Sequence, residues 1–415
     1  MILSSFFSPA RQSPTRKIFF TLLILFFFRL GNTIPLTGID QEALKKSFLQ
    51  LETRNALMQI LSMYSGSGVN GGTLLSPFSL GIIPYINASI LIDLLTAIFP
   101  TLEKLQSEEG EAGRQKLTFY KKIVTLLFSI LQSAFLLFYL QSYFYNPSLF
   151  HFFLLGLELV TGAMIIVWLS QLIDKKGIGN GTSLIIFTNI VMTLLNKNFF
   201  AIFNQNSFFL FEIGFLFFLF FLICISQITR IQVEVVSARQ LAFLEKIEKN
   251  TFTNKVSKNF QFQENGLSIR LNQAGIFPII IASNLLPFFS FLPFLQEKSI
   301  SSLFYYCLII CFNYFYTIVF WDPEKIAEQL RKASVSIVNV TPGAETISYL
   351  GNMVKASSIL GGLFLCLILF LFDFVKQVSN SPFLNQFQIS SLIILVGVAY
   401  ELQKTVRSLY KNVIE

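Results

Sequence analysis

The chain has 415 residues, of which 53% are hydrophobic and only 13% are charged, and its mean hydropathy is +0.63. Soluble domains carry roughly 25% charged residues, so this composition argues against a soluble enzyme, and the high apolar content argues against a disordered chain. A polytopic membrane protein remains. The net charge of +8 does not call for nucleic acid, because the basic residues follow the membrane topology derived below.

Ten apolar stretches are long enough, and sufficiently free of charge, to be membrane helices. The first five cover residues 17–36, 78–99, 123–140, 150–173 and 182–195. The second five cover residues 208–228, 274–295, 300–320, 358–374 and 387–406. Because the runs are continuous and do not alternate with period two, they favour helices over a β-barrel. We therefore predict an all-α polytopic membrane protein.

The basic residues test this number of spans. With ten spans, 24 of the 31 lysines and arginines fall on one side of the membrane and six on the other, and Arg29 lies near the end of the first span. Such asymmetry places the more basic side in the cytoplasm or stroma, together with both termini. A wrong number of spans would scramble the alternation.

An internal repeat relates the second helix of each half. Gly81–Leu91 and Gly275–Leu285 are identical at seven of eleven aligned positions, including the glycine and a proline. Five-helix halves have opposite orientations in the membrane, so the repeat is predicted to be inverted. Paired, proline-interrupted helices at matching positions are typical of a transport path between two halves. We expect the prolines to bend these helices, and the helices to face protein or a water-filled cavity.

The segment before the second helix, residues 61–75, is glycine-rich and too short to span the membrane. It is either an extracellular-side loop or a re-entrant segment that enters a cavity, and the residues favour neither.

No catalytic constellation is visible, and we expect neither a metal nor a cofactor. His151 is the only histidine, and the four cysteines lie in apolar runs without metal-ligand spacing. A secondary transporter of small solutes is the main alternative, since transporters also use inverted repeats. It would need intramembrane acids, but the candidates Asp93, Glu158 and Glu212 are better explained as interfacial. A structural scaffold would not need paired proline-containing helices.

Over nearly its whole length the chain resembles the SecY family of protein-translocation channels. The resemblance is carried by strings that occur in order along the ten spans. They include Arg29-Leu30-Gly31, Gly38-Ile39-Asp40, Leu80-Gly81-Ile82-Ile83-Pro84-Tyr85-Ile86, Pro100-Thr101-Leu102-Glu103-Lys104-Leu105, Glu109-Gly110-Glu111-Ala112-Gly113-Arg114, Gly177-Ile178-Gly179-Asn180-Gly181-Thr182-Ser183 and Asn272-Gln273-Ala274-Gly275.

The resemblance implies an hourglass channel made of two pseudo-symmetric inverted halves. Residues 1–204 would form the first half, with a plug, and residues 205–415 the second, with large cytosolic loops at 229–271 and 321–355. An apolar ring would seal the waist, and a lateral gate would open toward lipid between the second and third helices and the seventh and eighth. The ring residues would be Ile82, Ile86, Ile186, Ile190, Ile280 and Ile394. The gate residues would be Pro84, Asn87, Pro278 and Asn284. The plug would be Met63, Tyr64, Ser65, Gly66, Ser67, Gly68, Val69, Asn70, Gly71 and Gly72.

The resemblance also implies partners. A SecE-type subunit would clamp the halves, with or without a SecG-like subunit, while a SecA motor or a ribosome would dock on the cytosolic loops. Signal-sequence-bearing unfolded polypeptides would be the cargo, and membrane lipid would receive hydrophobic segments. The docking residues would be Arg230, Arg239, Lys246, Lys249, Arg270, Lys325, Arg331 and Lys332.

Two positions depart from the family pattern. Thr341 stands before Pro-Gly where the family usually has Arg, and Gln232 stands where the family usually has Pro. Both bear on motor coupling and leave the pore assignment intact. The phenylalanine-rich composition and the expected lack of a transit peptide resemble a plastid-encoded member in the thylakoid membrane, with a bacterial inner membrane as the alternative.

Overall fold

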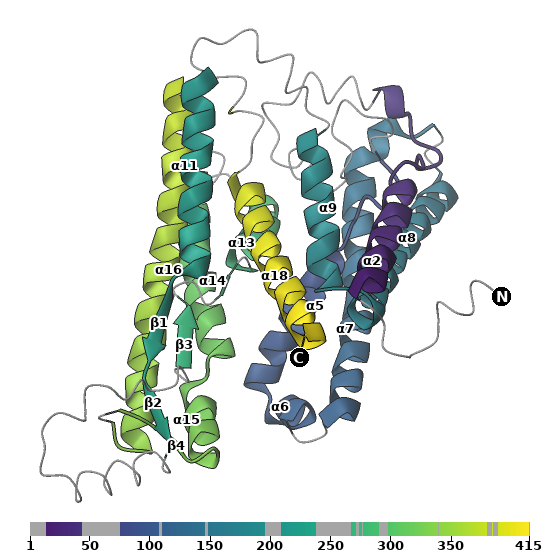
Figure 1. Cartoon of the computed structure of the whole chain (residues 1–415). Helices are drawn as coiled ribbons and strands as arrows, with labels where there is room; N and C mark the ends of the chain where they lie inside the picture. Colours follow the sequence, from purple (N-terminus) through teal and green to yellow (C-terminus); the bar gives the residue numbers. More distant parts are fainter. Residues whose placement is uncertain are drawn as a thin grey trace, which may run out of the picture. The chain divides into compact units, whose positions relative to one another are not determined.

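The structure is a computed structural model that describes residues 14–43, 75–107, 110–145, 148–195, 209–237, 267–270, 274–275, 277–289, 298–338, 340–379, 384 and 389–414. Figure 1 shows the whole chain with its elements labelled. Contacts divide the chain into two compact units. Unit 1 combines Met1–Phe209 with Pro382–Glu415, and unit 2 is Leu210–Ser381. The expected halves, 1–204 and 205–415, are defined by symmetry and not by contacts, so they stay a prediction.

Helices are the main elements of unit 1 among its described residues, and they are joined by turns and by one isolated β-bridge between Ile39 and Phe144. Its helices are α2 (Pro14–Gly31), α5 (Ile83–Ile98), α6 (Pro100–Ser107), α7 (Gly110–Leu140), η1 (Gln141–Tyr143), α8 (Leu149–Lys176), α9 (Gly181–Leu195) and α18 (Ile389–Ile414). Helix α7 packs on α5 and α8, while α9 packs on α8 and α18. One buried cluster, which includes Leu75, Leu137 and Leu159, joins α7 and α8 to the chain on both sides of residues 44–74.

Unit 2 contains four helices that correspond to predicted spans and a small cap. The four helices are α11 (Phe209–Ile228), α13 (Phe277–Phe289), α14 (Lys298–Phe320) and α16 (Ala344–Ser379). Helix α14 packs on both α13 and α16. With 36 residues, α16 is about 54 Å long, which exceeds the roughly 30 Å hydrocarbon layer. One end of this helix therefore extends beyond the membrane.

The cap joins the two large predicted loops. Its elements are β1 (Arg230–Val233), β2 (Val235–Ser237), β3 (Leu267–Arg270), α15 (Pro323–Lys332) and β4 (Val335–Ile337). Antiparallel pairs form between β1 and β3, and between β2 and β4, so the second pair crosses from one loop to the other. Figure 1 shows the strands and α15 gathered at one end of α16. Val233, Ile269, Ile337 and Leu350 form their buried core.

Every predicted span overlaps a helix among the described residues, which confirms the all-α polytopic fold. Five stretches are long and apolar enough to cross a membrane by themselves: Gly110–Phe138, Leu149–Lys176, Phe211–Ile228, Ile300–Lys332 and Ala344–Ser379. Ile83–Ile98 and Gly181–Met192 are shorter apolar helices. The second span begins at Ile83, five residues later than expected, because residues 77–82 form turns.

Candidate pore helices and docking surface

The two copies of the repeat begin their helices in the same way. Gly81 and Gly275, which are equivalent in the alignment, have left-handed backbones with φ of 60° and 63°. This conformation strains residues that carry a Cβ, which accounts for glycine in both copies. Pro84 and Pro278 each occupy the second residue of their helix. A proline there loses no helical hydrogen bond, so these two prolines begin α5 and α13 and do not bend them, contrary to expectation.

The candidate ring residues lie on four helices. Ile82 lies at the start of α5 and Ile86 in its first turn, Ile186 and Ile190 lie on α9, Ile394 lies on α18, and Ile280 lies on α13. A spacing of four places Ile82 and Ile86, and also Ile186 and Ile190, on a common helix face. All are buried except the half-buried Ile186. They contrast with apolar side chains such as Phe26 and Leu127, which are 62% and 59% exposed and suited to lipid.

Helix α9 is fixed at its start by the Gly-rich string at residues 177–183. The Asn180 side-chain oxygen accepts a hydrogen bond from the Thr182 backbone N–H at 3.0 Å, as an N-cap does. The Asp174 carboxylate accepts from the Gly181 N–H at 2.7 Å. A Cβ at Gly181 would lie 2.2 Å from the Ser170 carbonyl oxygen, so only glycine allows this approach of α9 to α8. The Ser183 hydroxyl donates to Glu401 at 3.3 Å and links α9 to α18.

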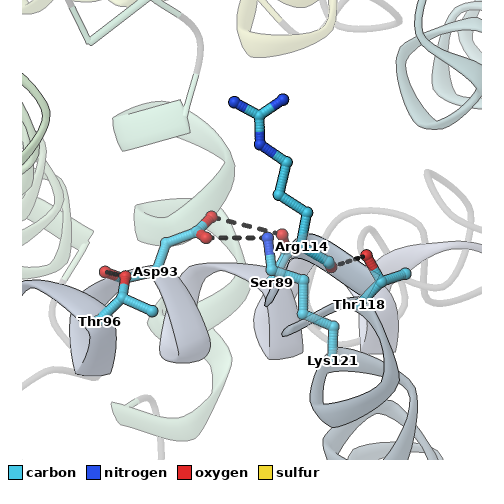
Figure 2. A network of polar contacts seen from close by, with 6 residues as sticks. All are labelled: Ser89, Asp93, Thr96, Arg114, Thr118 and Lys121. Atoms are coloured by element: carbon cyan, nitrogen blue, oxygen red, sulfur yellow. Dashed lines mark hydrogen bonds and ion pairs between the residues drawn. The ribbon is translucent and has the colours of Figure 1, made fainter. Parts of the chain in front are cut away.

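A polar contact joins the expected gate helix α5 to α7. The Lys121 ammonium lies 2.8 Å from the Asp93 carboxylate, and both side chains are mostly buried. The Ser89 hydroxyl donates to the other oxygen of Asp93 at 3.5 Å. Figure 2 shows this group, with the Arg114 side chain directed away from it. Together with the extensive packing of α5 on α7, the contact holds the two helices against each other.

The expected gate residues are partly described. Pro84 and Pro278 are buried and Asn87 is half-buried, while the side chain of Asn284 lies outside the described residues. The plug residues, 63–72, also lie outside them, as do Arg239, Lys246 and Lys249 of the docking loops.

The three acids weighed for a transporter occupy different surroundings. Asp93 pairs with Lys121, and Glu158 accepts a hydrogen bond from the Thr37 hydroxyl at 2.9 Å. Glu212, in the first turn of α11, is only 1% exposed. Asp93 and Glu158 are thus occupied by structural contacts.

The described docking residues lie on the cap. Arg230, Lys325, Arg331 and Lys332 are exposed, and Arg270 is half-buried. Arg230 and Arg270 are direct partners across the β1–β3 pair. Lys325 pairs with Asp322 at 3.4 Å and Lys332 pairs with Glu328 at 3.0 Å. The cap therefore displays basic side chains, some of them partly neutralised by neighbouring carboxylates.

The two departures from the family pattern lie in the two loops that form the cap, Gln232 on β1 and Thr341 between β4 and α16. The Thr341 hydroxyl donates to Glu345 at 2.6 Å, and the Thr346 hydroxyl donates to the Thr341 carbonyl at 2.8 Å. These bonds fix the residues that lead into α16. Gln232 is exposed on β1 and faces Ser268 of β3 in the register.

Sequence comparison gives a consistent result across nearly the full length. The SecY family model matches residues 76–403. The protein translocase subunit SecY of Pyropia yezoensis is 38% identical, with 94% of this chain and 95% of the relative covered. The protein translocase subunit SecY of Synechococcus elongatus is 34% identical, with 97% and 94% covered.

Comparison of folds finds solved structures with a similar fold. A solved structure described as that of a protein conducting channel has a TM-score of 0.66 to this structure at 12% identity. The match covers 97% of this chain and 94% of the other. Such a low identity bears on the fold alone.

Proposed function

The chain belongs to the SecY family, and we propose that it is the channel subunit of a protein translocase, which passes unfolded polypeptides across a membrane. The observation that carries the proposal is the matched start of α5 and α13, with a left-handed glycine, an early proline and a buried isoleucine, Ile86 or Ile280, in each copy. The small-solute transporter has no comparable support, and two of the three acids weighed for it, Asp93 and Glu158, are engaged in structural contacts.

The six isoleucines suit a seal that has no sequence preference. A translocating chain presents every kind of side chain, so fixed hydrogen-bond partners in the pore would hold some sequences back. Branched apolar side chains contact any sequence weakly, and an apolar constriction loses its water and blocks ions when it is idle. Burial of five of the six in the structure supports this role.

The lateral gate and the plug complete the proposed channel. Pro84, Asn87, Pro278 and Asn284 would line the gate, with α5 and α7 moving as one body. A segment exposed to lipid through the gate partitions by composition, since Leu or Ile gains roughly 0.3–0.6 kcal/mol and a central charge costs about 2.5–3.5 kcal/mol. Residues 63–72 would close the funnel on the side opposite the cap, as the resemblance implies.

The cap is the proposed docking surface for the energy source. Exposed Arg230, Arg331 and Lys332 suit the phosphates of ribosomal RNA or an acidic surface of a SecA-type motor. A SecE-type subunit, with or without a SecG-like subunit, would complete the complex. The protein is a multi-pass membrane protein, and similarity to the subunits from Pyropia yezoensis and Synechococcus elongatus supports a thylakoid location.

Crosslinking to a stalled polypeptide tests the pore. We expect a cysteine introduced at Ile86 or Ile280 to crosslink to a secretory chain halted midway through translocation. A cysteine at the lipid-exposed Leu127 of α7 is the matched control and should not crosslink to the hydrophilic part of that chain. Crosslinks at the control position with none at Ile86 or Ile280 would remove the pore assignment. Proton-driven uptake of a labelled small solute by the same vesicles would instead favour a transporter.

A further inference from the structure

The segment that leads into α5, residues 75–82, is held to three other parts of unit 1. We call it the lead-in segment. It starts at the fully buried Leu75 and ends at Ile82, the first candidate ring residue. Because only turns separate these two residues, whatever fixes the lead-in segment also fixes the position of α5.

The Gln41 side chain forms hydrogen bonds with both the backbone N–H and the backbone carbonyl of Leu75. Its side-chain amide nitrogen donates to the Leu75 carbonyl at 3.3 Å, and its amide oxygen accepts from the Leu75 N–H at 3.2 Å. The Leu36 N–H donates to the same carbonyl at 2.9 Å. An amide side chain has one donor and one acceptor group in the spacing of a peptide, so Gln41 pairs with Leu75 as a neighbouring strand would.

Phe78 occupies a slot between two glycines. Its ring stacks on the buried Phe28 of α2, with ring centroids 6.2 Å apart. A Cβ added at Gly31 of α2 would lie 2.0 Å from the Phe78 ring, and one added at Gly162 of α8 would lie 2.0 Å from the Pro77 carbonyl oxygen. Both contacts are far shorter than van der Waals distance, so the slot exists only because these two helices carry glycine there.

Short-range backbone hydrogen bonds connect this slot to the candidate pore-ring residues Ile82 and Ile86. The Gly81 N–H donates to the Phe78 carbonyl at 2.9 Å, and the Ile86 N–H donates to the Ile82 carbonyl at 3.1 Å. Only four positions separate Phe78 from Ile82. A shift of the Phe78 side chain is therefore passed to Ile82 and Ile86, because no flexible linker lies between them.

We propose that Gln41 and Phe78 are positioning residues for the seal, because they set the depth and rotation of α5 and so the placement of Ile82 and Ile86. This inference rests on the proposed channel function. Neither side chain belongs to the ring, gate, plug or docking sets derived from the family resemblance.

The slot is tested by a compensating pair of substitutions. The full chain, purified with the subunits that accompany it, is placed in planar bilayers and the ion conductance of the idle channel is measured. We expect Gly31→Ala to raise it, and Gly31→Ala/Phe78→Leu to return it toward the wild-type value, because the smaller side chain makes room for the added methyl group. Gly162→Ala should raise it too, but Phe78→Leu should not correct that variant, since its added methyl meets the backbone of Pro77.

The hydrogen bonds between Gln41 and Leu75 are tested separately, so that this test does not depend on expression of the glycine variants. Gln41→Leu removes both hydrogen bonds and should raise idle conductance about tenfold. Gln41→Glu keeps an acceptor for the Leu75 N–H and should give a smaller increase. Wild-type conductance in folded Gln41→Leu and Gly31→Ala channels would overturn the proposal, as would equal correction of both glycine variants by Phe78→Leu.

Crosslinking at Ile86 separates this proposal from the function on which it rests. If wild-type Ile86 crosslinks to a translocating chain while the variants stay as tight as wild type, the channel function stands and the positioning role fails. If Ile86 never crosslinks, both fail.

Discussion

Ile86 and Ile280 are equivalent residues of the internal repeat, and both are buried even though they lie on short helices of a membrane protein. An isoleucine that faced lipid would be exposed in the isolated chain, as Phe26 and Leu127 are. Burial therefore separates these residues from the lipid-facing set and supports the ring assignment.

A polar side chain in the seal should let ions pass. Replacing Ile86 or Ile280 with Asn supplies an amide that holds water in the constriction, so we expect idle conductance to rise at least tenfold, the change that about 1.4 kcal/mol produces. The variant channel should also discriminate less strictly between polypeptides with functional and defective signal sequences. Conductance of reconstituted channels in planar bilayers measures the first effect.

Ile86→Val is the control, because it keeps a branched apolar side chain. Bilayers as tight with Asn as with Val at this position would count against an apolar seal.

The contact between Asp93 and Lys121 belongs to the scale of elements, since it ties α5 to α7. Replacing Lys121 with Met leaves the Asp93 carboxylate without its counter-charge at a mostly buried site. We expect a loss of about 1–2 kcal/mol of stability, between the values for exposed and buried pairs. Thermal unfolding of the purified protein in detergent measures it.

The neighbouring Lys122→Met is the matched control, because no ion pair of Lys122 occurs among the described residues. Adding Asp93→Asn to Lys121→Met should recover most of the loss, since the unpaired charge is gone. If both lysine variants unfold at the same temperature as wild type, α5 and α7 are held by packing alone.

The elements were predictable from sequence where hydropathy governs them. Each of the ten apolar stretches overlaps a helix among the described residues, but the second begins at Ile83 because Gly81 adopts a left-handed conformation that hydropathy does not report. Helix α15 was missed, although Asp322 followed by Pro323 is a common helix start and its side chain accepts from the Glu324 N–H at 3.0 Å.

Pairing between strands that lie far apart in the chain could not be predicted from the sequence. Strands β2 and β4 have three residues each and are almost a hundred positions apart, so no local pattern indicates that Val235 pairs with Ile337. The lead-in segment was hidden for the same reason. Gln41 and Leu75 are separated by 34 positions in the sequence. The need for glycine at positions 31 and 162 follows only from the close packing of Phe78 and Pro77 in the folded structure.

At the scale of the whole molecule, the distribution of charge sets the orientation. Most lysines and arginines fall on one predicted membrane side, and unit 2 builds its cap from the two longest loops of that side. Topology alone requires only short basic loops. A folded cap with its own buried core, including Val233, Ile269 and Ile337, suits the docking surface that we propose.

The cap should bind ribosomes through charges that are not already neutralised. On α15, Lys332 is paired with Glu328, whereas no ion pair of Arg331 occurs among the described residues. We therefore expect Arg331→Gln to weaken ribosome binding more than Lys332→Gln. If Arg331 contacts one RNA phosphate, its loss should lower the slope of log affinity against log salt by about 0.7–0.9. Co-sedimentation of ribosomes with proteoliposomes over a range of salt concentrations gives both quantities, and equal slopes for the two variants and wild type would place the docking contact elsewhere.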